Sequence, residues 1–246
     1  EMEREFANCG PEVIDADGAL VTPGLIDPHT HPVFSATRED EFEKRLQGVS
    51  YMEIAQAGGG IRRSVRDLRS TPADILWQKA KHRLDRFLQH GVTTIEAKSG
   101  YGLSTESEIK QLEVIAALNE SHAVDMVPTF LGAHEFPDEY RDDRNAYVEL
   151  VINEMLPEIA KRRLAVFSDI FCEEGYFTPV ESFNLLETAL SLGMLPRLHA
   201  NQFHSIGCIE TAVELEAVSV DHLEILTDEE IGLLAMTDIA CVMLPG

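Results

Sequence analysis

The strongest constraint on the fold is a repeated alternation of short apolar runs with longer amphipathic segments. The apolar runs are rich in β-branched residues and have the length of strands. The predicted strands are 20–27, 93–97, 125–131, 167–171, 196–199, 219–221 and 239–244. The predicted helices between them are clearest at 72–90, 105–119, 146–163, 179–192 and 205–216. Because strand–helix alternation favours parallel pairing, we expect an α/β fold with a parallel sheet.

Unusual polar residues fall where these predicted strands end. They are His29 and His31, Glu96 and Lys98, His134, Glu173, His199, and His222. A (β/α)8 barrel gathers its chemistry at the carboxyl ends of all its strands, whereas an open sheet binds ligands at one switch point. The pattern therefore favours a TIM-like barrel. Only seven strands are predicted, so we expect a barrel that is incomplete at its C-terminus, with the eighth strand missing.

The first residues differ from the rest of the chain. Turn signals at Asp17–Gly18 and Pro23–Gly24 precede the first predicted barrel strand. We expect residues 1–19 to be the remnant of an N-terminal β element and residues 20–246 to form the barrel, with its strands 1 to 7.

Composition narrows the range of partners. The chain of 246 residues has 43 acidic and 20 basic residues, which gives a formal net charge of −23. This balance argues against binding to nucleic acid or to an anionic membrane surface. No apolar run reaches the roughly 18 residues of a membrane span. The four cysteines are far apart and form no CxxC pair, which predicts a reduced, cytoplasmic chain.

The segment "GLIDPHTHPVF" contains two histidines one residue apart. Alternate side chains of a strand share a face, so His29 and His31 would lie side by side. His199, which ends a later strand, would bring a third imidazole to the same edge. Neutral imidazole suits zinc and ferrous iron, and three protein ligands leave a position for water. His222 could be a further ligand or could hydrogen-bond the water. The alternative is that these histidines cap strands or lie in the core.

Several motifs together resemble a known group. "PGLIDPHTH", "RLHANQ" and "VDHLE" are similar to the histidine motifs of the metal-dependent amidohydrolase superfamily. "EAKSGYGL", "FLGAHEFP" and "DIFCEEGYF" resemble imidazolonepropionases within it. The resemblance implies a TIM-like barrel that hydrolyses 4-imidazolone-5-propanoate to N-formimidoyl-L-glutamate in histidine degradation. It also implies one divalent metal ion, zinc or iron, a small anionic substrate, and a possible homodimer.

The resemblance also assigns the metal site. His29, His31 and His199 match the positions of metal ligands, and His222 matches the residue that orients or deprotonates the attacking water. The superfamily's last ligand, an aspartate after the eighth strand, has no counterpart here. Asp221 and Asp238 lie on or near earlier strands and do not replace it.

Four further residues are assigned to the substrate by resemblance. Arg38 and Tyr101 would hold the propanoate, His134 would contact the ring and stabilise charge on its carbonyl oxygen, and Gln202 would hydrogen-bond the ring. An arginine fork matches a carboxylate, which suits Arg38 to this role. Its acidic neighbourhood also allows a plain surface salt bridge.

Some interpretations stay open on sequence alone. Glu96 and Lys98 share a strand face and form either a buried ion pair or a catalytic pair, and Glu173–Glu174 fits a solvated loop. The same metal cage could serve another cyclic amidohydrolase, a deaminase of an aromatic base, or a metal-binding relative without activity.

Overall fold

The computed structural model describes residues 14–244, and its centre is a single parallel sheet. The strands are β1 (Leu25–Thr30), β2 (Val92–Lys98), β3 (Asp125–Ala133), β4 (Phe167–Cys172), β5 (Leu195–Ala200), β6 (Ser219–His222) and β7 (Ala240–Met243). They pair in chain order, β1 to β7, and every pair is parallel. The predicted parallel α/β fold is thus confirmed.

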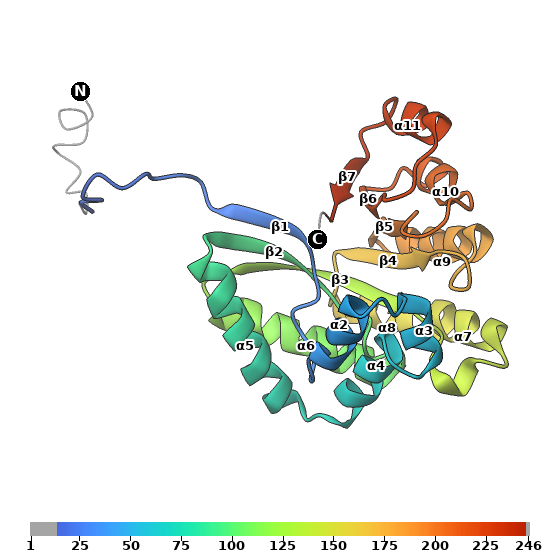
Figure 1. Cartoon of the computed structure of the whole chain (residues 1–246), viewed down its shortest axis with the longest axis horizontal. Coiled ribbons are helices and arrows are strands. Elements are labelled where there is room, and N and C mark those ends of the chain that lie inside the picture. The colour runs from blue at the N-terminus through green and yellow to red at the C-terminus, as the bar shows by residue number, and fades with distance from the viewer. Residues whose placement is uncertain (1–13, 245–246) are drawn as a thin grey trace.

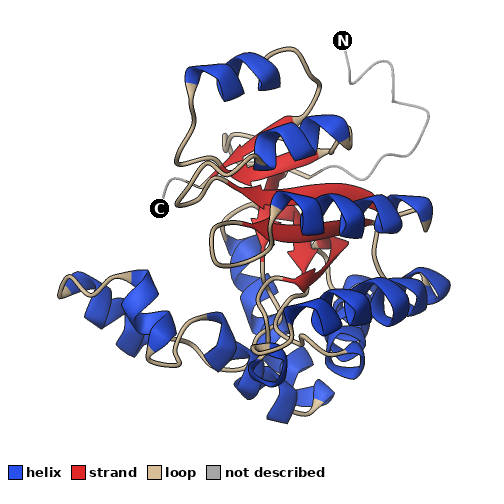
Figure 2. Cartoon of the chain, turned by 90° about the vertical axis from the view of Figure 1, so that its right-hand side faces the viewer, coloured by secondary structure: helices blue, strands red, loops and turns tan. Residues whose placement is uncertain are grey.

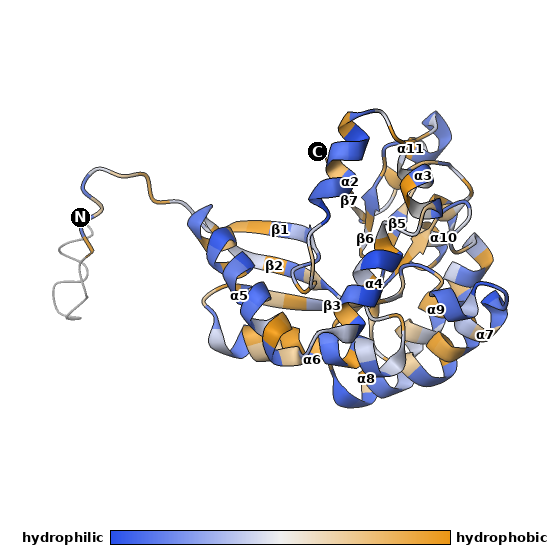
Figure 3. Ribbon diagram, turned by 60° about the horizontal axis from the view of Figure 1, so that its bottom comes forward, coloured by the Kyte–Doolittle hydropathy of each residue, from blue (hydrophilic) through white to orange (hydrophobic). Residues whose placement is uncertain are grey.

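The helices lie around this sheet, as Figure 2 shows. They are α2 (Glu39–Leu46), α3 (Tyr51–Gln56), α4 (Ile61–Ser70), α5 (Ala73–Gln89), α6 (Thr105–Ser121), α7 (Arg144–Leu150), α8 (Leu156–Arg162), α9 (Pro179–Ser191), α10 (Cys208–Glu214) and α11 (Asp228–Leu234). A 3-10 turn, η1 (Asp138–Tyr140), and a π-helical turn, η2 (Val151–Met155), complete the list. Figure 3 shows hydrophobic and hydrophilic residues side by side along α5 and α6, as in amphipathic helices that pack on a sheet.

The sheet curves into a nearly closed barrel, and its strands follow one another in Figure 1. A contact across the interior demonstrates the curvature, because His29 Nδ1 on β1 lies 2.7 Å from Asp221 Oδ2 on β6. The strands β2 to β5 separate these two strands in the sheet. Among the described residues the barrel has seven strands, with β1 and β7 at the edges, in agreement with the predicted seven-stranded barrel. Side chains on the two edge strands are therefore exposed: Ile26 of β1 is 70% exposed and Met243 of β7 is 60% exposed.

The first strand begins later than predicted. The apolar run 20–27 predicts this strand, but β1 starts at Leu25, whose N–H donates to the carbonyl of Gly91. Leu20 and Val21 are 89% and 81% exposed and pair with no strand. Figure 1 shows this segment extending away from the sheet. Of the predicted N-terminal element, residues 1–13 lie outside the described part of the chain.

The predicted helix 146–163 is interrupted. α7 passes through the π-turn Val151–Met155 before α8 continues to Arg162. Pro157 has no N–H to donate to the preceding turn, which accounts for the local widening. The three helices α2, α3 and α4 between β1 and β2 were not predicted.

The prediction of reduced cysteines is wrong for one pair. Cys172, the last residue of β4, and Cys208, the first residue of α10, form a disulfide across a sequence separation of 36. Their spacing gave no sign of this because the fold alone brings the end of β4 beside the start of α10. Cys241 is free and exposed. No helix in residues 14–244 has the length and apolarity required to cross a membrane.

Leu112 provides a test of the core between α6 and the sheet, since its side chain is fully buried. We expect Leu112→Ala to lower the free energy of unfolding by about 2–5 kcal/mol, because it removes buried contacts and leaves a cavity. Urea denaturation measures the change. Leu190→Ala, at a 42% exposed position of α9, is the matched control and should cost well under half as much. Equal losses in the two variants would contradict this packing.

Candidate active site

Five histidines from four strands meet at the carboxyl ends of the barrel strands. His29 lies on β1, His31 follows it, His134 follows β3, and His199 and His222 lie on β5 and β6. The ring centroids of His29 and His199 are 4.6 Å apart, those of His31 and His134 5.1 Å, and those of His199 and His222 5.2 Å. Their positions at the ends of predicted strands indicate one common edge, and the structure brings these side chains together.

The arrangement has the geometry of a cation site. Two groups of three histidines, His29–His199–His222 and His31–His134–His199, each have ligand atoms that all lie within 4.8 Å of one another. His31 Nδ1 is buried and has no hydrogen-bond partner among the described residues. An orphaned nitrogen of this kind, within a set of imidazoles, fits a divalent ion such as zinc or ferrous iron.

Burial keeps these imidazoles in the neutral form that binds metals. Loss of hydration lowers the pKa of His29 to about 3, against the opposing effect of its hydrogen bond to Asp221. The same cause lowers the pKa of His134 and His199 to about 4 and that of His31 well below its usual value. Near neutral pH each of these rings therefore has a lone pair available for a ligand or a substrate.

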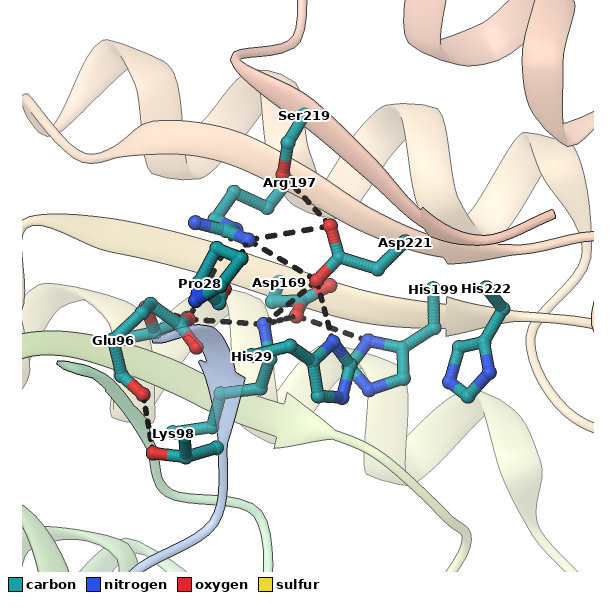
Figure 4. Close-up of polar contacts among 12 residues, drawn as sticks. Pro28, His29, Glu96, Lys98, Asp169, Arg197, His199, Ser219, Asp221 and His222 are labelled. Carbon is teal, nitrogen blue, oxygen red and sulfur yellow. Dashed lines mark hydrogen bonds and ion pairs between the residues drawn. The ribbon is translucent and has the colours of Figure 1, made fainter. Parts of the chain in front are cut away.

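Carboxylates lie behind two of the rings, as Figure 4 shows. His29 Nδ1 is 2.7 Å from Asp221 Oδ2, and His199 Nδ1 is 3.0 Å from Asp169 Oδ2. A neutral ring that donates its Nδ1 proton to a carboxylate presents its Nε2 lone pair on the opposite side. Asp221 is thus a hydrogen-bond partner of the ring of His29.

The pair Glu96–Lys98, whose role the sequence left open, belongs to a buried ionic network. Lys98 Nζ lies 2.9 Å from Glu96 Oε1 and 2.7 Å from Asp169 Oδ2. Arg197 Nη2 lies 3.1 Å from Asp221 Oδ2 and donates to the carbonyl of Pro28 at 2.9 Å. Burial alone would raise the pKa of Asp221, but Lys98 and the hydrogen bond from His29 outweigh it and hold the pKa well below its usual range.

Tyr101 lies beside the histidines, and Arg38 lies near Tyr101. The ring of Tyr101 is 5.2 Å from that of His31 and 5.4 Å from that of His134. Arg38 precedes α2, and its charge is felt at Tyr101, where it partly offsets the rise in pKa that burial causes. Arg38 also forms a 3.7 Å ion pair with Glu41, whose side chain is buried, so this pair is not the plain surface salt bridge that the acidic neighbourhood allowed. Gln202 is half-buried in the loop after β5, three residues beyond His199.

Hydrogen bonds determine which nitrogens face the site. His134 Nδ1 lies 3.0 Å from the carbonyl oxygen of Gly100, which can only accept, so this nitrogen carries the proton. His222 Nδ1 lies 3.3 Å from a carboxylate oxygen of Glu224. A ring that keeps its only proton on Nδ1 in these contacts leaves Nε2 as an acceptor.

Glu173 lies in an environment that differs from the one its sequence predicts. We expected a solvated loop pair, but Glu173 is 1% exposed. Its Oε2 accepts from the N–H groups of Phe203 at 2.8 Å and His204 at 3.3 Å, and its Oε1 contacts His204 Nδ1 at 2.9 Å. Glu173 thereby fixes the loop that carries Gln202. Its partners lie about 30 residues further along the chain, so local sequence gave no signal of the contact.

Comparison with known proteins identifies the family. The chain is 50% identical over 248 aligned residues to an imidazolonepropionase of Geobacillus kaustophilus, which covers 100% of this chain and 58% of that protein. It is also 50% identical to the imidazolonepropionase of Brevibacillus brevis, covering 96% of this chain and 55% of that protein. This chain belongs to the imidazolonepropionase family. It spans a little over half the length of these curated relatives, and no protein-family model matches it.

Solved structures confirm the barrel fold at much lower identity. A 5-methylcytosine deaminase of Klebsiella pneumoniae with bound 5-fluorocytosine superposes with a TM-score of 0.67 at 16% identity, covering 95% of this chain and 58% of that one. An adenosine deaminase of Xanthomonas campestris with bound zinc gives a TM-score of 0.55 at 16% identity, covering 91% and 49%. This chain thus shares the barrel fold of these two deaminases.

The neutral histidines make stability depend on pH. The usual histidine pKa is about 6.5. Since folding lowers the pKa of His134 and His199 to about 4, the unfolded chain binds more protons between these values, and stability falls as pH falls from 6.5 towards 4. Each site contributes at most about 1.4 kcal/mol per pH unit.

Urea denaturation of the metal-free chain at pH 7.0 and 5.5 tests this dependence. We expect the free energy of unfolding to be lower at pH 5.5, and we expect His134→Gln to reduce the difference between the two pH values. An unchanged difference in that variant would show that His134 already titrates normally in the folded chain.

Proposed function

We propose that this chain carries the catalytic barrel of an enzyme that hydrolyses 4-imidazolone-5-propanoate to N-formimidoyl-L-glutamate, a step of histidine degradation. The observation that carries the proposal is the convergence of five histidines with Tyr101 at one end of the barrel, in a chain about 50% identical to curated imidazolonepropionases. Arg38 supplies a local cation for an anionic substrate in a chain of net charge −23.

We assign the metal to His29, His31 and His199. The family resemblance supports these ligands, and the neutral, closely spaced rings fit them. A bound divalent ion, zinc or iron, would act as a Lewis acid and lower the pKa of a water molecule. The zinc in the adenosine deaminase neighbour is in keeping with this choice.

His222 is the proposed base for the attacking water. Its Nδ1 faces Glu224, so Nε2 is available to accept the proton of the water and to return it to the departing ring nitrogen. The ring lies 5.4 Å from that of His29 and 5.2 Å from that of His199, which places it beside the proposed ligands.

The remaining residues bind and orient the substrate. Arg38 and Tyr101 would hold the propanoate, and Gln202 would exchange hydrogen bonds with the ring. Because His134 Nδ1 is committed to Gly100, neutral His134 would accept a hydrogen bond from a ring N–H through Nε2. It would stabilise charge on the carbonyl oxygen only after taking up a proton, for which burial leaves little tendency near neutral pH.

The proposal also includes the cellular location, the oligomeric state and the domain organisation of the enzyme. We place the enzyme in the cytoplasm as a homodimer acting on a small anionic molecule, with residues 1–19 as the remnant of a β element beside the 20–246 barrel. The family resemblance supports these points, and the acidic composition speaks against nucleic acid as a partner.

Metal content and turnover test the reaction. We expect the full-length protein to bind about one equivalent of zinc or iron and to open 4-imidazolone-5-propanoate, and we expect a chelator to abolish turnover until metal is restored. Elemental analysis and an absorbance assay of ring opening measure both. Bound metal with ammonia release from an aromatic base, and no imidazolone turnover, would instead indicate a deaminase. Bound metal with neither activity would indicate an inactive relative.

Arg38 provides a test of substrate class. Loss of a charge-assisted bond to a carboxylate costs about 1.5–3 kcal/mol, so Arg38→Ala should raise KM by about tenfold to a hundredfold with a smaller effect on kcat. Arg45→Ala, at an exposed position on α2, the helix that Arg38 precedes, is the matched control and should leave KM unchanged. Identical kinetics in the two variants would show that the propanoate binds elsewhere.

A further inference from the structure

Five charged side chains lie buried within the barrel beneath the histidine cluster. Lys98, Asp169 and Asp221 are fully enclosed, and Glu96 and Arg197 are 4% and 5% exposed. They come from β2, β4, β5 and β6, and Figure 4 shows them between the strands and the rings of His29 and His199. None of the roles proposed above for substrate binding or proton transfer uses them.

Lys98 has a distinctive place among these charges. Its Nζ lies 2.7 Å from Asp169 Oδ2 and 3.2 Å from Asp221 Oδ2. Arg197 reaches Asp221 at 3.1 Å but forms no ion pair with Asp169. Within residues 14–244, Lys98 is thus the only lysine or arginine within ion-pair distance of both carboxylates.

These same carboxylate oxygens face the histidine rings. Asp221 Oδ2 is 2.7 Å from His29 Nδ1, and Asp169 Oδ2 is 3.0 Å from His199 Nδ1. The contact of His29 satisfies hydrogen-bond geometry, while Asp169 and His199 are close but imperfectly aligned. Each oxygen is therefore shared between the ammonium group of Lys98 and one imidazole.

The shared ammonium determines where the oxygens can sit. Two carboxylates in a buried site repel each other strongly, because little water screens their charges. An ammonium between them turns this repulsion into two attractions and fixes both oxygens at a set distance from Nζ. Without it, Asp169 and Asp221 would separate, and the two rings would lose the acceptors that fix their orientation.

We propose that Lys98 is a positioning residue that holds Asp169 and Asp221 against Nδ1 of His199 and His29, so that both rings present Nε2 to one divalent ion. This assignment rests on the proposed metal site. Lys98 is enclosed on all sides and its amino group is occupied by carboxylates, so it has no direct contact with substrate. Its influence on the metal passes through the two aspartates.

Zinc affinity, measured on the purified chain by competition with a chromogenic chelator, tests the proposal. Changes in the partners of metal ligands typically cost 10- to 100-fold in affinity, and we expect a loss of that size for Lys98→Met. Lys110→Met is the matched control, because Lys110 donates to backbone carbonyls of Leu68, Arg69 and Thr71, all outside the network. Its affinity for zinc should equal that of the unaltered chain.

Nitrogen-15 spectra of the metal-free chain report the tautomers of the histidine rings. A residue that only stabilises the fold would leave these tautomers unchanged. We expect His29 and His199 to carry their proton on Nδ1 in the unaltered chain and to become tautomer mixtures in Lys98→Met. Asp221→Asn should change the tautomer of His29 more than that of His199. This second variant provides a test of the contacts if Lys98→Met does not fold. Normal zinc affinity and unchanged tautomers in Lys98→Met would overturn the positioning role. Failure of the unaltered chain to bind zinc or iron would overturn the metal site itself.

Discussion

A layer of charge inside the barrel is the constraint on which the candidate site depends. In barrels of this type the interior is filled in layers, and the side chains of one layer come from alternate strands. Here the alternate strands β2, β4 and β6 contribute Lys98, Asp169 and Asp221, which lie within ion-pair distance of one another through Lys98. An apolar layer is the usual filling. The charged layer therefore gives the histidines directly above it a set of fixed acceptors.

Stability alone does not account for this layer. Each buried charge loses several kcal/mol of hydration, and well-packed apolar residues of similar size are often as stable or more so. Removal of one member of the network would also lower the stability of the fold, because an unpaired charge would remain buried. A role in orienting the rings of His29 and His199 gives a physical reason for charged residues at positions where leucine or valine would otherwise serve.

The fold and the histidine cluster could be predicted because both follow from local patterns. Strand and helix periodicities extend over only a few residues, and parallel strands place all their carboxyl ends at one edge, which is why His29 and His199 were placed together. The boundary of β1 was missed because Leu20 and Val21 are apolar but have no partner strand. Helices α2 and α4 were missed because most of their residues are polar or charged, although α4 buries Ile61, Val65 and Leu68 at helical spacing.

The contacts behind the rings could not be predicted, because each joins residues far apart in the sequence. Asp221 lies 192 residues from His29, and Asp169 lies 71 residues from Lys98. Which face of each strand turns inward, and which carboxylate then meets which cation, depends on the curvature of the sheet. The disulfide Cys172–Cys208 and the loop contacts of Glu173 were hidden for the same reason.

Backbone strain next to the proposed base follows from the same geometry. His222 and Leu223 have φ angles of 84° and 62°, in a region that costs non-glycine residues about 1–3 kcal/mol each. Asn201, itself at φ 56°, offsets part of this cost: its amide donates to the carbonyl of Ile225 and to Glu230 on α11. The chain after β6 is thus tied to the loop after β5. The turn imposed at His222 brings its Nδ1 to Glu224, and this leaves Nε2 as the acceptor that a base in the proposed reaction needs.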